Sequence, residues 1–410
     1  MNRQSPSGAA PTPENPVYLD YAATTPVDPR VVQAMLECLG PDATFANAAS
    51  THSPGIAARD RVERARAQVA ARIGARPEEI VFTSGATESS NLALKGVLDQ
   101  TAGAGNVDAR PRRLLTTRIE HKSVLDTAAW LAARGCEVVY LPTDETGRLA
   151  PGTLAEALVG SDVKAMVSLM HVNNELGTLQ DIETLAGVCA EHGAWLHVDA
   201  AQSVGKVPLL LGDRGVRLCS LTAHKICGPK GIGALYVQSG TRLDARIHGG
   251  AHEGGLRSGT LATHQIVGMG ESFALAQPEA EQPRIAALAQ RLWQGLQCIE
   301  GVRRNSAPEH AIANILSVSF PGVEGESLRF ALADLAVSSG SACNSAVPEP
   351  SYVLRSIGLS DALAGATLRI SIGRFTQVQE IDYAVSRIVE SVGQLRALAV
   401  DAPAWVRQPG

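Results

Sequence analysis

The sequence predicts an α/β fold built on a mostly parallel, doubly wound sheet. Short apolar segments recur up to about residue 277, and stretches with helical patterning separate them. This alternation is typical of parallel sheets, whose neighbouring strands need a helical crossover. Several of the apolar segments end in polar clusters, as buried strands do when they deliver side chains to the carboxyl edge of a sheet.

The expected elements follow in order along the chain. An amphipathic helix is predicted over residues 59–73, and Ser84–Glu88 is predicted to be the turn from the first strand into the next helix. The stretch Thr101–Arg113 is rich in Gly, Ala and Arg and is expected to be a surface loop. The predicted strands are Ile80–Thr83, Leu114–Thr117, Glu137–Leu141, Ala165–Met170, Trp195–Val198, Arg217–Leu221 and Ala234–Val237.

The pattern changes near Gln277 and Pro278. A long helix is expected over about 283–299, followed by the strand Asn314–Phe320, a helix, a Gly/Ser loop and the strand Thr367–Ile372. This looks like a smaller α+β domain, and 410 residues are long for one core. We therefore expect a disordered tail (1–16), a segment packing with the small domain (17–32), a large domain (33–277), a small domain (278–400) and a second tail (401–410).

Composition narrows the function classes. Hydrophobic residues make up 45% of the chain and charged residues 19%, which is typical of globular proteins. The net charge of −5 gives no reason to expect nucleic acid or a membrane as partner, and no apolar run is long enough to span a bilayer. Residues 1–16 lack the apolar core of a secretory signal, so a cytoplasmic protein is expected. Seven cysteines without a C-x-x-C pair argue against a disulfide framework or a zinc site.

Two predicted strands end in residues that suit one cofactor. Lys225 closes the segment that begins at Ser220, and Asp199 closes the segment that begins at Trp195. Pyridoxal phosphate needs a lysine for its Schiff base and an acid to pair with its ring nitrogen. Taken alone, Asp199 could cap a helix and Lys225 could be a solvated lysine.

The turn at Ser84–Glu88 adds a third candidate part of a cofactor site. Backbone N–H groups at a helix start, with Ser and Thr hydroxyls, can hold a phosphate. By itself the turn is more simply a helix capped by Ser84 or Thr87. The phosphate turn, Asp199 with Gln202, and His224 with Lys225 occur in order on three strand ends, and this favours a cofactor site. The competing lysines, Lys122 and Lys230, are less well placed.

His121 and Cys343 are the candidate reactive groups. His121 follows the strand at Leu114–Thr117, where an imidazole could stack on the cofactor ring and move protons. Cys343 lies in a loop of Ser, Gly and Ala, which we expect to be mobile, so its thiol could visit the cofactor and then an external acceptor. The alternatives are a packed or surface histidine and a buried structural cysteine.

Together these residues resemble the class V aminotransferase superfamily and, within it, the cysteine desulfurases of the iron–sulfur-cluster type. The resemblance runs from about Tyr18 to about Leu398. The segments that carry it are Tyr18–Pro26, Val81–Asn91, Glu120–Lys122, Met170–Glu175, His197–Gly205, Ala223–Gly233, Arg257–Thr260 and Val337–Cys343.

The resemblance implies a type I pyridoxal-phosphate aminotransferase fold and a role for each matching residue. Lys225 would carry pyridoxal 5'-phosphate, Asp199 would pair with its ring nitrogen, and His121 would lie over the ring. Gln202 and Asn174 would contact the side of the ring hydroxyl. The phosphate would be held by Ala86, Thr87, Thr222 (where the family usually has Ser) and His224, and by Thr260 of the neighbouring subunit in a homodimer.

The resemblance also implies the reaction. Arg369 would bind the substrate carboxylate, with Asn174 nearby, although without the family Arg369 would be taken for a surface residue on an edge strand. L-Cysteine would become L-alanine, and its sulfur would pass as a persulfide on Cys343 to an iron–sulfur scaffold, to tRNA thiolation or to another acceptor. The alternatives are an aminotransferase, a selenocysteine lyase, a non-catalytic sulfur carrier or scaffold and, least favoured, a metal–thiol module.

Overall fold

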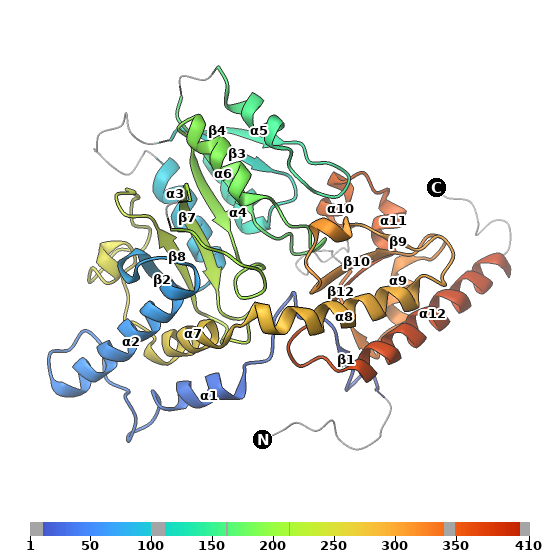
Figure 1. Cartoon of the computed structure of the whole chain (residues 1–410), viewed down its shortest axis with the longest axis horizontal. Helices are drawn as coiled ribbons and strands as arrows, with labels where there is room; N and C mark the ends of the chain where they lie inside the picture. The colour runs from blue at the N-terminus through green and yellow to red at the C-terminus, as the bar shows by residue number, and fades with distance from the viewer. Residues whose placement is uncertain (1–10, 100–110, 161–162, 213, 340–348, 402–410) are drawn as a thin grey trace.

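The structure is a computed structural model that describes residues 11–99, 111–160, 163–212, 214–339 and 349–401. Two bodies of unequal size lie side by side (Figure 1). The larger contains a seven-stranded sheet between layers of helices, and the smaller contains a three-stranded sheet. The long helix α8 (Pro278–Leu296) runs from the larger body into the smaller one.

The seven-stranded sheet has the order β2-β8-β7-β6-β5-β3-β4. Only β8 runs antiparallel to its neighbours, so the sheet is mostly parallel, as predicted. Since β2 and β7 both oppose β8, their carboxyl ends lie at the same edge as those of β3, β5 and β6. The strands are β2 (Ile80–Thr83), β3 (Arg113–Thr117), β4 (Glu137–Leu141), β5 (Ala165–Met170), β6 (Trp195–Asp199), β7 (Val216–Thr222) and β8 (Gly233–Val237).

Helices cover both faces of this sheet. Successive strand residues point to opposite faces, and both members of pairs such as Val81 and Phe82 are buried. Phe82 belongs to one apolar cluster with α2, α5, α6 and α7, and Val81 belongs to another with α3 and α4. Burial on both faces explains why these strands are continuously apolar. The helices are α1 (Pro29–Leu36), α2 (Ser53–Arg72), α3 (Ala86–Leu98), α4 (Lys122–Ala132), α5 (Pro151–Leu158), α6 (Ile182–Glu191) and α7 (Thr263–Leu275).

The smaller body is an antiparallel sheet, β12-β10-β9, packed against α8 and the C-terminal helix. The N-terminal segment joins it, because β1 (Val17–Tyr18) pairs with β11 (Leu335–Ala336) and Leu19 is buried in its core. Its remaining elements are β9 (Arg303–Arg304), β10 (Ile315–Ser319), α9 (Gly325–Ala331), α10 (Tyr352–Ser356), α11 (Asp361–Gly365), β12 (Thr367–Ser371) and α12 (Val378–Asp401). The described residues also include the short 3-10 helices η1 (Pro77–Glu79), η4 (Glu253–Gly255) and η5 (Pro308–His310).

All seven strands predicted for the large sheet are present, and their bounds differ by no more than one residue at either end.

Two helix starts were predicted wrongly. Helix α2 begins at Ser53, because His52 Nδ1 accepts a hydrogen bond from Gly55 N (3.2 Å) and Pro54 suits the first turn. Helix α8 begins at Pro278, because proline likewise suits the first turn of a helix. Most of the loop predicted at Thr101–Arg113 lies outside the described residues, and Arg113 begins β3. No helix in the described part of the chain is long and apolar enough to cross a bilayer.

The N-terminal segment packs closely against the small sheet at Gly373, and this contact can be tested by substitution. A Cβ atom added to Gly373, just after β12, would lie 1.9 Å from the buried ring of Tyr21. Gly373→Ala should therefore lower the free energy of unfolding by about 1–3 kcal/mol, seen as a lower thermal midpoint. Gly187→Ala, on the exposed side of α6 where nothing lies within 4 Å, should instead raise it. Equal midpoints for the two variants would contradict this packing.

Candidate active site

A cavity of about 800 Å³ opens at the carboxyl edge of the large sheet, where the loops after β2, β3, β5, β6 and β7 meet the small-domain strand β12. Most of the residues predicted from the sequence line it. They are Ala86, Thr87, His121, Asn174, Asp199, Gln202, Thr222, His224, Lys225 and Arg369. Thr260 is exposed and lies outside this lining. Cys343 lies outside the described residues.

The turn after β2 forms an open helix start. Helix α3 begins at Ala86, and its N-cap is Gly85, which has no side chain to cap it. The alternative that Ser84 or Thr87 caps this helix is therefore wrong. Glu88 accepts a hydrogen bond from Ser84 N (2.7 Å), and the backbone packs so tightly that a Cβ on Gly233 would lie 2.6 Å from Gly85 Cα. The first-turn N–H groups have no partner inside a helix, so they are free for an anion such as a phosphate.

Lys225 is half-buried and packs against the N-terminal segment. Its Nζ donates hydrogen bonds to the carbonyl oxygens of Ala22 (2.5 Å) and Ala23 (2.6 Å). Burial, with a smaller effect from the nearby Arg369, lowers the pKa of Lys225 to about 8. The competing lysines, Lys122 and Lys230, also line the cavity but are exposed. Lys225 is therefore the lysine best prepared to act as a neutral amine.

Asp199 ends β6 and is almost fully buried. Its Oδ1 accepts a hydrogen bond from Ala201 N (2.9 Å), and turns rather than a helix follow, so the helix-cap alternative is wrong. Burial raises the pKa of this carboxyl, while His121 and Lys225 act to lower it. A carboxylate in this setting is stabilised by a cationic N–H, such as that of a protonated pyridine ring.

Arg369 lies on β12 and closes the cavity from the small domain. It is only 8% exposed, so the surface-arginine alternative is wrong. Its Nη1 donates to Asn174 O (3.0 Å) and its Nη2 to Asp20 Oδ1 (2.8 Å). Arg369 Nε and Asn174 Oδ1 are buried without a partner among the described residues. Buried polar groups are normally paired, so these two atoms indicate a polar ligand.

His121 is the N-cap of α4, which explains its place just after a strand. Its Nδ1 accepts a hydrogen bond from Ser123 N (3.1 Å) and lies 2.9 Å from Ser123 Oγ. With Nδ1 accepting, the neutral ring carries its proton on Nε2. The capping bond therefore fixes both the orientation and the tautomer of this imidazole.

Several residues of the site were missed by the sequence analysis. Ala22 and Ala23 contribute only backbone carbonyls, and Lys206 contacts the site through another side chain. Glu175 lines the cavity and accepts a hydrogen bond from Ser351 Oγ (2.5 Å), and burial raises its pKa to about 7. The roles of Ala22, Ala23 and Glu175 depend on partners far away in the chain, so no local pattern indicates them.

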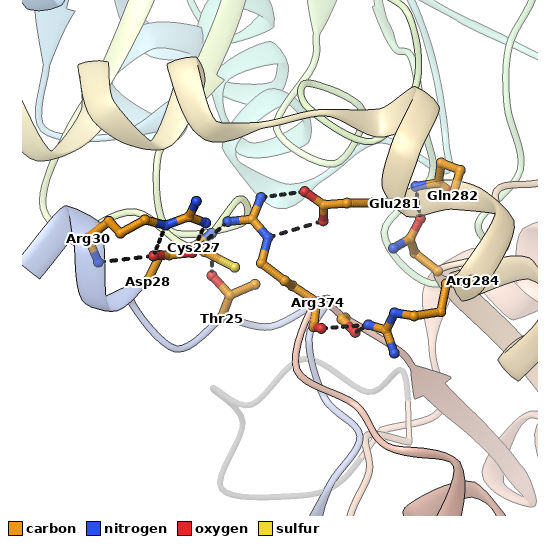
Figure 2. A network of polar contacts seen from close by, with 10 residues as sticks. Thr25, Asp28, Arg30, Cys227, Glu281, Gln282, Arg284 and Arg374 are labelled. Carbon is orange, nitrogen blue, oxygen red and sulfur yellow. Dashed lines mark hydrogen bonds and ion pairs between the residues drawn. The ribbon is translucent and has the colours of Figure 1, made fainter. Parts of the chain in front are cut away.

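A polar network couples the Lys225 turn to the small domain (Figure 2). Cys227 N donates to Thr25 Oγ1 (2.8 Å), and Asp28 N donates to Cys227 O (2.9 Å). The Asp28 carboxylate pairs with Arg374 (2.9 Å), which follows β12 and also pairs with Glu281 (2.7 Å). The segment that holds the lysine is thus tied to the strand that carries Arg369.

Comparison with known proteins agrees with this geometry. The aminotransferase class V family matches residues 17–384. This chain belongs to the class V aminotransferase family. Two relatives within it are the proteins named cysteine desulfurase IscS of Aeromonas hydrophila, 52% identical, and of Proteus mirabilis, 51% identical, each over 95% of both chains.

Solved structures of this family have the same fold. A NifS-like protein superposes with a TM-score of 0.84 at 34% identity, covering 93% of this chain and all of the other. A structure described as SspA in complex with cysteine gives a TM-score of 0.76 at 36% identity, covering 87% of this chain and 98% of the other. The predicted type I fold is thereby confirmed.

The cofactor of this family is pyridoxal phosphate, and the residues of the cavity fit it. The uncapped start of α3 offers N–H groups for the phosphate. Lys225 offers an amine with a lowered pKa, and Asp199 a buried carboxyl. Asn174 Oδ1, buried without a partner among the described residues, can accept a further hydrogen bond. The residues that line the cavity therefore fit this cofactor.

The pKa of Lys225 leads to a pH prediction for cofactor uptake. Only the neutral amine attacks the cofactor's aldehyde, and the fraction of neutral amine rises as the pH passes the Lys225 pKa of about 8. In cofactor-free protein, the visible band should therefore grow faster with rising pH and reach half its maximal rate near pH 8. Lys225→Arg should form no such band. A rate independent of pH, or one still climbing near pH ~10 like an ordinary lysine, would contradict the assignment.

Proposed function

We propose that the protein is a cysteine desulfurase that converts L-cysteine to L-alanine and retains the sulfur as a persulfide on Cys343. The observation that carries this proposal is the meeting of Lys225 and the buried Arg369 in one cavity, which brings an amine base and a carboxylate-binding group together. The names of the curated relatives, and a solved relative in complex with cysteine, support the same substrate.

The substrate is held from both domains. Arg369 binds the α-carboxylate with its unpartnered Nε, while Asp20 and the Asn174 carbonyl hold the rest of the guanidinium in place. Asp20 therefore orients the arginine rather than the substrate. The carboxylate then lies on the small-domain side of the cavity, and the Cα–H bond faces the large domain and Lys225.

The chemistry follows from the groups around this substrate. Bound pyridoxal phosphate supplies an electron sink for charge that develops at Cα. Lys225 accepts the Cα proton as a neutral amine, which its lowered pKa of about 8 makes available. Asp199 stabilises positive charge at the base of the cavity. His121, with Nδ1 engaged by Ser123, offers its Nε2–H as a donor.

Sulfur transfer is the task of Cys343. Its thiolate attacks the substrate sulfur, so that an S–S bond forms as the Cβ–S bond breaks. The electron pair of the broken bond goes to Cβ, which takes up a proton and becomes the methyl group of alanine. The Nε2–H of His121 assists by donating a hydrogen bond that stabilises this thiolate. The persulfide then passes its outer sulfur to an acceptor protein, which we propose to be an iron–sulfur scaffold.

We further propose a cytoplasmic homodimer. Thr260 is exposed and does not line the cavity of its own chain, so its hydroxyl can assist phosphate binding only in a second copy. The cytoplasm fits a reaction that needs a reduced thiol on the enzyme.

The proposed activity can be tested directly. Purified protein should show a visible band at ~420 nm that shifts when L-cysteine is added. In the presence of a reductant, alanine and sulfide should form in equal amounts. Keto acid without sulfide would indicate transamination, and turnover of selenocysteine but not cysteine would indicate a lyase. Either outcome would refute the desulfurase assignment while leaving the cofactor in place.

A cysteine substitution separates the transfer step from cofactor binding. Cys343→Ala should keep the visible band and its shift with L-cysteine, but sulfide release should fall by at least ~100-fold because no thiolate remains to take the sulfur. Cys298→Ala is the matched control, since Cys298 is an exposed free cysteine of the small domain. Its alanine and sulfide production should match the unmodified protein. Undiminished turnover by Cys343→Ala would refute the role of Cys343.

A further inference from the structure

Lys206 is a buried lysine without an acidic partner. It lies in the turns after β6, is 9% exposed, and donates one hydrogen bond, from Nζ to Gln202 Oε1 (2.8 Å). No ion pair joins it to any described residue. Its titratable or charged neighbours are Lys225, Arg369 and Cys227, and burial followed by the charge of Lys225 lowers its pKa to about 7. Burying an unpaired amine is costly, so the position calls for a functional explanation.

The contacts of Gln202 provide that explanation. Its Nε2 donates to Ala22 O (2.7 Å), while its Oε1 accepts from Lys206. A backbone carbonyl only accepts and an ammonium group only donates, so a single orientation of the amide satisfies both contacts. The amide group is therefore held from two opposite sides.

This arrangement leaves one N–H of Gln202 available. The amide nitrogen has two hydrogens, and Ala22 O is the acceptor for one of them. No other acceptor for Gln202 Nε2 occurs among the described residues, and Gln202 lines the cavity next to Lys225. The remaining N–H can thus serve a ligand oxygen in the cavity.

We propose that Lys206 is a positioning residue that holds Gln202 so that its free amide N–H is offered to the ring oxygen of the cofactor bound at Lys225. The proposal rests on the proposed function, since it needs pyridoxal phosphate in this cavity. A donor stabilises the ionised form of that oxygen, whereas a turned amide would present an oxygen and destabilise it. Lys206 thereby sets the proton affinity of the cofactor–lysine linkage without touching the cofactor.

Stability separates this role from a structural one. Replacing the unpaired charge of Lys206 by an apolar side chain of similar length removes the cost of burying that charge, which offsets the loss of its hydrogen bond to Gln202. Lys206→Met should therefore keep or raise the thermal midpoint while it alters the cofactor. Such a result would show that Lys206 contributes to the cofactor site and not to the stability of the fold.

The test is a pH titration of the visible band in the cofactor-loaded protein. Lys206→Met should raise the titration midpoint by about one pH unit, the size expected for one hydrogen bond to a charged group. Lys206→Arg keeps a cationic donor and should stay close to the unmodified protein. Gln202→Leu should shift the midpoint as Lys206→Met does, and the double variant should shift no further, because Lys206 acts through Gln202.

Three results would overturn the inference. The first is an unchanged titration midpoint of the visible band in Lys206→Met. The second is a full additional shift when Lys206→Met is added to Gln202→Leu, which would indicate a direct effect of the Lys206 charge on Lys225. The third is a shift of the titration midpoint that is accompanied by loss of folding. The titration needs bound cofactor but no turnover, so a protein that titrates as expected and makes no alanine would refute the desulfurase function alone. Absence of any visible band in the unmodified protein would refute both.

Discussion

The structure depends on the contact between the Lys225 side chain and the carbonyl oxygens of Ala22 and Ala23, about 200 residues earlier in the chain. The N-terminal segment that supplies these carbonyls also pairs with β11 and buries Leu19 in the small-domain core. It therefore holds the reactive lysine of the large domain and completes the small domain at once. Burial against carbonyls, rather than against a carboxylate, restrains the amine while keeping its proton weakly bound.

The charges around this lysine are arranged for an anionic ligand. The buried Lys206 and Arg369 lie near the half-buried Lys225, and Arg369 is held by Asp20. Desolvation destabilises such a group of cations until phosphate and carboxylate groups enter. The same desolvation lowers the pKa of the two lysines and leaves Arg369 as the permanent positive charge, which suits the carboxylate-binding role that we propose for it.

The large domain contributes Lys225 to the cavity and the small domain contributes Arg369. Ion pairs and hydrogen bonds join the two domains. Asp28, close to the lysine turn, pairs with Arg374, which in turn pairs with Glu281 at the start of α8 (Figure 2). Asp28 is almost fully buried, so this pair is little screened by solvent. It fixes the distance between the substrate-binding strand β12 and the lysine. The position of Arg369 relative to Lys225 consequently depends on the ion pairs that join the two domains.

The strands, their mostly parallel arrangement and the polar residues at their ends could all be predicted from the amino-acid sequence. Parallel strands buried on both faces need continuous apolar runs, and their carboxyl ends must meet at one edge, so Asp199 and Lys225 were predictable neighbours. The sequence did not predict that Arg369 is buried or that Gln202 is held against Ala22. These features arise from contacts between segments distant in the chain, and residue type or periodicity carries no record of such partners.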